Sequence, residues 1–132
     1  MISAIGKSYS FAAAHRLWRD DWDAESNRRA FNRCVNLHGH SYTVEVELVG
    51  QVNPETGMVC NYYEMDRIIK PIVDVLDHGE LPLHEYFTFL PTAENIADWF
   101  FQQLIAFEWP NNARVSRVRV KESEKTYAET LA

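Results

Sequence analysis

Hydrophobic and polar residues alternate along three stretches of the chain, 2–14, 40–49 and 114–122. A period of two places successive side chains on opposite faces of a β-strand, so each stretch predicts a strand with one apolar face. A further short strand is expected near residues 127–130. The residues predicted to share the buried face are Tyr9, Phe11, Ala13, Tyr42, Val44, Val46, Leu48, Ser116, Val118 and Val120.

Two other stretches have the three-to-four residue spacing of amphipathic helices. The first covers residues 62–76, and Pro71 inside it predicts a kink or a break. The second runs to about residue 107 and follows Thr92, which is expected to be its N-cap. The two apolar stripes are Tyr62, Met65, Ile69, Ile72 and Leu76, then Ala93, Ala97, Phe100, Leu104 and Phe107.

Between the first two strands, residues 18–33 carry mixed charges without a clear period, and we expect a loop with a helical turn. The order strand, strand, helix, helix, strand predicts an α+β fold. Its sheet would be antiparallel and four-stranded, with two helices packed on one face. A length of 132 residues suits one domain spanning residues 1–132.

Composition narrows the class of protein. The net charge of −6 and pI of about 5.3 argue against binding nucleic acid through bulk charge. No run approaches the roughly 18 apolar residues of a membrane helix, and the amino terminus lacks the apolar core of a signal peptide. Two cysteines, Cys34 and Cys60, cannot form a disulfide framework, so we expect reduced thiols in a cytoplasmic protein. Cys60 is interpreted as a core residue at a strand end.

The segment "CVNLHGH" combines one thiol and two imidazoles within seven residues. His38 and His40 are two residues apart and share a face, and His15 has the parity of the buried face of the first strand. If these strands pair, the three imidazoles converge at one end of the sheet. Three neutral nitrogens with a fourth position free are typical of catalytic zinc. Alternatively, the histidines are loop-end residues bonded to backbone or water.

Three other groups are candidates for proton transfer. Cys34 lies beside Arg33, and a cation or a metal nearby favours the thiolate, which is a base and a nucleophile; the alternative is a half-buried small residue. Asp77 precedes His78, and a carboxylate that orients an imidazole commonly tunes a base; the alternative is a cap or turn. His84 is expected on the surface.

Glu122 has the parity of Val118 and Val120, so it should point toward the apolar face at the end of its strand. A carboxylate there needs a partner. A ligand with paired N–H donors, such as an aminopyrimidinone edge, would supply one. Alternatively, a one-residue bulge turns Glu122 to solvent.

Six motifs occur in the order "FAAAHRL", "CVNLHGHSYTVEV", "GMV", "LDH", "PTAENIADW" and "VKES". Together they resemble the 6-pyruvoyltetrahydropterin synthase and 6-carboxytetrahydropterin synthase family over about residues 9–123. The resemblance implies the tunnelling fold, in which subunits join edge to edge into a barrel. It also implies a homo-oligomer, a hexamer or a tetramer, with active sites between subunits.

The resemblance further implies a role for each motif residue. The matching positions are His15, His38 and His40 as Zn²⁺ ligands, Cys34 as catalytic base, Asp77 with His78 as relay pair, and Glu122 and Thr92 in the pterin pocket.

Three residues separate Cys34 from His38, which resembles the bacterial 6-carboxytetrahydropterin synthases of the 7-deazaguanine (queuosine) pathway. Asn61, where an aspartate is common, and the long loop 18–33 depart from that pattern. The resemblance implies a zinc-dependent lyase that converts 7,8-dihydroneopterin triphosphate to 6-carboxy-5,6,7,8-tetrahydropterin, releasing acetaldehyde and triphosphate. The alternatives are a 6-pyruvoyltetrahydropterin synthase and a non-catalytic pterin- or zinc-binding protein. Candidates for contacting the triphosphate, unless they belong to a solvated loop, are Arg16, Arg28, Arg29 and Arg33.

Overall fold

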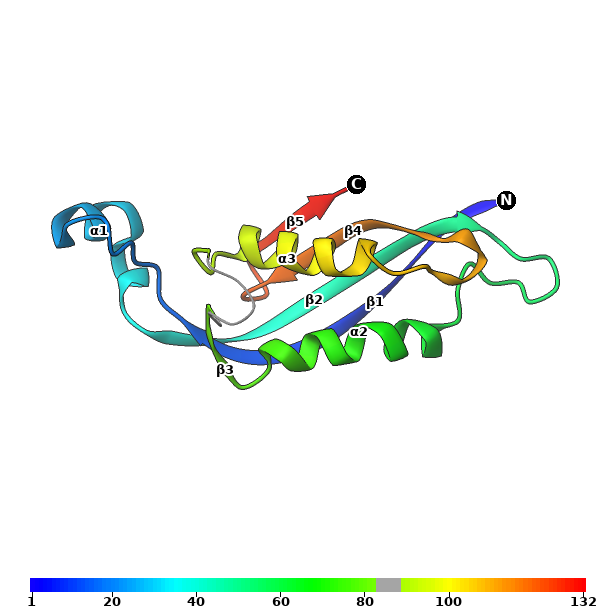
Figure 1. The fold of residues 1–132 in the computed structure, drawn as a ribbon, viewed down its shortest axis with the longest axis horizontal. Coiled ribbons are helices and arrows are strands. Elements are labelled where there is room, and N and C mark those ends of the chain that lie inside the picture. Colours follow the sequence, from blue (N-terminus) through cyan, green and yellow to red (C-terminus); the bar gives the residue numbers. More distant parts are fainter. Residues whose placement is uncertain (83–88) are drawn as a thin grey trace.

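The computed structural model describes residues 1–82 and 89–132, and His84 lies outside these residues. The described chain forms one sheet with helices α2 and α3 on the same side of it (Figure 1). The elements are β1 (Ile2–His15), α1 (Ala24–Phe31), the 3₁₀ turn η1 (Asn32–Val35), β2 (His38–Gln51), α2 (Tyr62–Leu76), β3 (Gly79–Leu81), α3 (Ala93–Ile105), the 3₁₀ turn η2 (Pro110–Asn112), β4 (Arg114–Lys121) and β5 (Tyr127–Leu131).

The sheet has the order β3-β1-β2-β4-β5. β1 and β2 pair antiparallel over their whole length, from Ile2 opposite Gln51 to His15 opposite His38. The α+β class and the short last strand β5 are confirmed. The expectation of a four-stranded antiparallel sheet is wrong, because β3 adds a fifth strand that runs parallel to β1. A strand of three residues is too short to show an alternating pattern.

The core lies between the sheet and the two long helices, with α2 against β1 and α3 against β4 and β5. The inward side chains of β2, from Tyr42 to Leu48, are fully buried, as the alternation predicted. The β1–β2 ladder therefore holds the end of β1 against the start of β2, which is where the histidines lie.

The predicted inward face of β4 is wrong at one position. Glu47 is opposite Arg117 while Leu48 is opposite Val115, so the register skips Ser116. The extra residue is a β-bulge that reverses the parity before it. Val115 is buried, and the Ser116 hydroxyl donates to the Glu47 carboxylate on the outer face at 2.8 Å.

Each long helix begins after a side-chain N-cap, of which only Thr92 was predicted. The Asn61 side chain accepts the Tyr63 N–H, and the Thr92 hydroxyl accepts the Asn95 N–H at 3.2 Å. The predicted break in α2 is not observed: the helix runs through Pro71 to Leu76. Pro71 is exposed, so water can bond the carbonyl that its missing N–H leaves free. α3 ends at Ile105, two residues before the predicted end.

The charged segment contains a two-turn helix, α1, where we expected a loop with one helical turn. α1 stands beyond the end of the sheet (Figure 1). Asp23 caps it by accepting the Ser26 N–H at 2.7 Å, and the buried Asn27 side chain bonds the backbone of Arg19. Asn27 is the one buried residue of α1, so no apolar stripe marked this helix in the sequence.

Candidate functional site

Three histidines meet where β1 ends and β2 begins. His15 is opposite His38 in the ladder, and His40 is opposite Ala13, so all three side chains lie on the inner face. One nitrogen from each ring lies within 4.8 Å of the other two. The structure therefore brings together the three imidazoles that strand parity had placed on one face, and the group could hold a metal ion.

Two backbone carbonyls orient the rings. His15 Nδ1 lies 2.7 Å from the Pro91 carbonyl oxygen, and His38 Nδ1 lies 2.7 Å from that of Asn36. A carbonyl only accepts, so each ring donates from Nδ1, and in the neutral form of the ring Nε2 carries the lone pair. This is the usual support of a metal-binding histidine. Sequence reasoning missed Pro91 and Asn36 because backbone acceptors leave no residue signature.

The two inward nitrogens test whether a metal fits. His15 Nε2 and His38 Nε2 are 3.0 Å apart, so either a proton or a metal ion must lie between them to offset the repulsion of their lone pairs. Two nitrogens bound to one tetrahedral zinc at about 2.0–2.1 Å would be about 3.3 Å apart. The donor set and its spacing therefore fit a divalent ion that accepts imidazole.

Burial favours the form of His15 that binds a metal. The side chain is 2% exposed, and this desolvation lowers the pKa of His15 below its ordinary value. The Pro91 carbonyl and the charge of Glu122 raise that pKa and offset the effect only in part. A neutral imidazole at physiological pH is the ligating form.

Glu122 lies at the opposite side of the same site. Thr43 pairs with Lys121 at the end of the β2–β4 ladder, so the next residue, Glu122, falls beside Tyr42. Its charge contributes, after burial, to raising the pKa of the Tyr42 phenol. Glu122 is half-buried and lines a hollow of about 480 Å³ together with His40. The strand therefore directs the carboxylate toward the histidines, and the bulge of β4 occurs at Ser116 instead.

Asp77 and His78 form a pair fixed to β1. Asp77 Oδ1 accepts the Ala12 N–H at 2.9 Å, and Oδ2 lies 3.0 Å from His78 Nδ1. The Ala12 N–H and then His78 lower the pKa of Asp77, so the carboxylate is ionised near neutral pH. The His78 side chain is 84% exposed and shares a hollow of about 450 Å³ with His40. Its Nε2 is thus available to a ligand there.

Cys34 lies in η1, partly exposed. Its carbonyl accepts the Leu17 N–H at 2.7 Å, which ties η1 to the chain just after His15. The thiol is not one of the three grouped ligands, and it does not line the hollow that His40 and His78 share. Cys60 is buried in the core as predicted, although in the bend before α2 and not at a strand end, and burial raises the pKa of its thiol.

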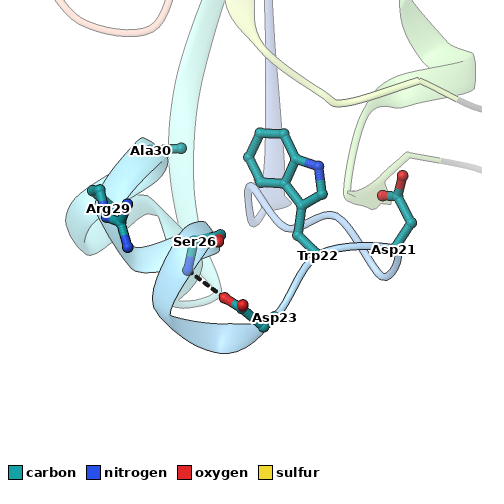
Figure 2. Close-up of a pocket in the computed structure, with 6 residues that line it drawn as sticks. All are labelled: Asp21, Trp22, Asp23, Ser26, Arg29 and Ala30. Carbon is teal, nitrogen blue, oxygen red and sulfur yellow. Dashed lines mark hydrogen bonds between the residues drawn. The ribbon is translucent and has the colours of Figure 1, made fainter.

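Two of the four candidate arginines have partners within their own segment. Arg16 stacks over the Trp18 ring at 4.7 Å, and Arg29 pairs with Glu25 at 3.2 Å. Arg29 also lines a separate hollow of about 510 Å³ against α1, in which Trp22 stands upright between flanking carboxylates (Figure 2). Among the described residues, those that line this hollow all lie between Asp21 and Ala30 and include none of the three histidines. No described helix has the length and apolar character needed to cross a membrane.

Comparison with known proteins gives a consistent set of similarities. The sequence pattern described as "6-pyruvoyl tetrahydropterin synthase" matches residues 4–132. The 6-pyruvoyl tetrahydrobiopterin synthase of Dictyostelium discoideum is 35% identical, over 71% of this chain and 72% of that protein. The putative 6-carboxy-5,6,7,8-tetrahydropterin synthase of Archaeoglobus fulgidus is 36% identical, over 95% and 92%.

A solved structure supports the same likeness. The 6-pyruvoyl tetrahydropterin synthase of Caenorhabditis elegans superimposes with a TM-score of 0.91 at 29% identity, covering 100% of this chain and 96% of that one. The predicted tunnelling fold is thereby confirmed, with a five-stranded sheet.

Proposed function

Because the chain belongs to the 6-pyruvoyl tetrahydropterin synthase family, we propose that it is a zinc-dependent lyase acting on 7,8-dihydroneopterin triphosphate. The products would be 6-carboxy-5,6,7,8-tetrahydropterin, acetaldehyde and triphosphate, as in 7-deazaguanine (queuosine) synthesis. The observation that carries the proposal is the pair of Nε2 atoms of His15 and His38, 3.0 Å apart and turned toward each other beside His40.

In this proposal His15, His38 and His40 hold the zinc ion. When bound by three imidazoles with one position open, zinc supplies Lewis-acid polarisation to an oxygen of the ligand. The carbonyls of Pro91 and Asn36 keep two of the three rings turned inward, so little rearrangement is needed for binding.

The proton-transfer roles belong to Cys34 and to the Asp77–His78 pair. Cys34, as thiolate, removes a proton from the substrate side chain. Asp77 holds His78 with Nδ1–H toward the carboxylate, which leaves Nε2 to accept and return protons. Such a thiol needs a reducing compartment, and both cysteines are free, which supports a cytoplasmic location.

Glu122 and Thr92 are proposed to bind the pterin ring. A carboxylate presents two acceptor oxygens, which match the paired N–H donors of an aminopyrimidinone edge. Glu122 is half-buried and lines the same hollow as His40. A pterin ring bound to Glu122 would therefore direct the side chain of the substrate toward the metal ligands. Thr92 uses its hydroxyl to cap α3, so its contribution comes from holding that end of the pocket.

The second candidate product is 6-pyruvoyltetrahydropterin, formed when triphosphate is eliminated and the carbon chain is kept. Relatives named for this product match this chain about as well as those named for the carboxy product, which favours keeping it. The three-residue gap between Cys34 and His38 supports the carboxy product. A non-catalytic binder is disfavoured, because it would not require the pairing of Asp77 with His78.

The sheet edges support the proposed homo-oligomer, a hexamer or a tetramer with sites between subunits. β3 pairs only with Ala13–His15, so most of one β1 edge has no strand partner among the described residues, and β5 ends the sheet on the other side. Open edges of this length are normally covered. A neighbouring copy would cover them and could bring its own Cys34 or α1 to this site.

The test is incubation of zinc-loaded protein with 7,8-dihydroneopterin triphosphate, followed by mass spectrometry of the products. We expect 6-carboxy-5,6,7,8-tetrahydropterin with acetaldehyde. A 6-pyruvoyl product would select the second candidate. Unchanged substrate, with one zinc bound per chain, would contradict both enzymatic proposals.

A further inference from the structure

Tyr42 occupies an unusual position on the inner face of β2. It is fully buried, and among the described residues its hydroxyl is the buried side-chain polar atom that has no hydrogen-bond partner. A buried O–H without a partner costs free energy, so native structures rarely keep one without a reason. The fold holds the ring firmly all the same, stacked on Phe11 with centroids 4.8 Å apart and planes 9° apart.

A second tyrosine shows that this sheet can satisfy such a group. Tyr9 lies on the same inner face, two residues before Phe11 on β1, and is 8% exposed. Its hydroxyl donates to the Asp66 carboxylate on α2 at 2.8 Å. The unpartnered hydroxyl of Tyr42 is therefore not a general property of tyrosines on this face.

The surroundings of Tyr42 contain the two groups that would hold a ligand. Its ring lies edge-on to His15 and His40, with centroids 6.0 and 5.4 Å away. On the neighbouring strand, Glu122 falls beside it, one residue past the last ladder pair. Tyr42 is therefore the inner-face residue of β2 that lies both next to His40 and opposite Glu122.

We propose that the Tyr42 hydroxyl donates a hydrogen bond to an acceptor atom of the pterin ring bound between Glu122 and the histidines. This inference rests on the proposed function and adds a specificity-determining residue to that site. The Glu122 carboxylate can only accept, so it recognises the N–H edge of the ring. A phenol hydroxyl supplies a donor for the carbonyl oxygen or the ring nitrogens, and both together distinguish a pterin from rings with another donor pattern.

The test is Tyr42→Phe, which removes one oxygen atom and keeps the ring and its packing. The probe is unsubstituted pterin, which has no side chain or phosphate and so reports ring recognition alone, titrated into zinc-loaded protein by fluorescence. We expect the Kd to rise about tenfold, which corresponds to about 1.4 kcal/mol. Zinc content is expected to stay unchanged, and Tm to stay equal or rise, because an unpaired buried hydroxyl is removed.

The matched control is Tyr9→Phe. It removes a satisfied hydroxyl from the same face, so Tm should fall while the Kd for pterin stays within twofold of the wild type. A Kd of Tyr42→Phe within twofold of the wild type overturns the inference, as does an equal rise in both variants, which would indicate a packing effect.

A second readout needs no variant. In the unmodified protein, bound pterin should slow exchange of the Tyr42 hydroxyl proton in NMR spectra, and unchanged exchange in the saturated complex overturns the inference. The two proposals fail in different ways. If zinc-loaded wild type does not bind pterin at all, the proposed function falls and this inference with it; if wild type binds and Tyr42→Phe binds equally, only this inference falls.

Discussion

Two regions of the same inner sheet face differ in whether their buried polar groups have hydrogen-bond partners. Around Tyr9, the phenol donates to Asp66 at 2.8 Å and Lys7 Nζ pairs with the same carboxylate at 2.6 Å. Around Tyr42, the hydroxyl has no partner among the described residues, and the Nε2 atoms of two imidazoles face each other at 3.0 Å. We call these the paired region and the open region.

The difference separates groups that stabilise the fold from groups that await a ligand. A buried polar atom without a partner costs about 1–3 kcal/mol, so the open region destabilises the free chain. A ligand that binds only the folded state stabilises it and can offset this cost. The paired region contains no unpartnered group of this kind, so its stability does not depend on a ligand. Violations of local pairing rules of this kind are expected at functional sites.

The strongest way to break the comparison is His38→Ala. His38 is only half-buried, so the fold should survive its loss, whereas zinc affinity should fall by about 100-fold or more, because even outer-shell changes at zinc sites cost about 10–100-fold. Competition with a chromogenic chelator measures the change. Lys7→Ala in the paired region is the control and should keep the wild-type affinity; equal losses in both would erase the distinction.

Each region also has a free cysteine nearby. The Cys34 carbonyl accepts the N–H of Leu17, two residues after His15, and Cys60 lies near Tyr9. Cys34→Ala should lower turnover of 7,8-dihydroneopterin triphosphate by about 10²–10⁴-fold with zinc still bound, as expected for loss of a base. Cys60→Ala should leave turnover unchanged and lower thermal stability, because it empties part of the core. Full turnover by zinc-loaded Cys34→Ala would show that another group is the base.

The free energies of unfolding of Tyr9→Phe and Tyr42→Phe compare a partnered hydroxyl with an unpartnered one. Removing a satisfied hydroxyl in Tyr9→Phe should lower the free energy of unfolding by about 1 kcal/mol. Removing the unpartnered one in Tyr42→Phe, without ligand, should not lower it. Urea titrations of both variants give the two values. A larger loss in Tyr42→Phe than in Tyr9→Phe would mean that the hydroxyl is already paired in the free protein.

The smallest expected effect is a pH dependence of the paired region. Lys7 first, and then Tyr9, hold the pKa of Asp66 below its ordinary value. The ionised carboxylate therefore stabilises the fold fully above about pH 4–5, and this contribution is lost as pH falls through the folded-state pKa. Asp66→Asn should flatten the acid side of the stability curve measured by urea unfolding. The exposed Asp98→Asn should not, and an identical acid slope in wild type and Asp66→Asn would contradict the pairing.

Much of the fold was predictable because its strands and helices are long enough to show their periods. The exceptions have local causes. β3 has three residues, α1 buries only Asn27, and one extra residue at Ser116 reverses the parity of β4 before it. Pro71 does not break α2, because it lies on the exposed side of a helix held by its buried face.

The part of the site that depends on the alternation of side chains along a strand was predictable. Parity placed His38 with His40 and directed Glu122 inward, and the ladder of β1 with β2 brought His15 to them. The backbone contacts were not predictable. The carbonyl of Pro91 and the N–H of Ala12 are backbone groups, and the residue type does not indicate which backbone groups will bond a side chain. The place of Cys34 relative to a substrate depends on packing between copies, which a single sequence does not encode.

The open region is most directly tested by X-ray absorption at the zinc edge, on protein loaded with one equivalent of zinc. We expect three imidazole nitrogens and one further light ligand at about 2.0–2.1 Å, with one ion per chain. A sulfur at about 2.3 Å, or an ion surrounded by water oxygens alone, would contradict a site built by His15, His38 and His40.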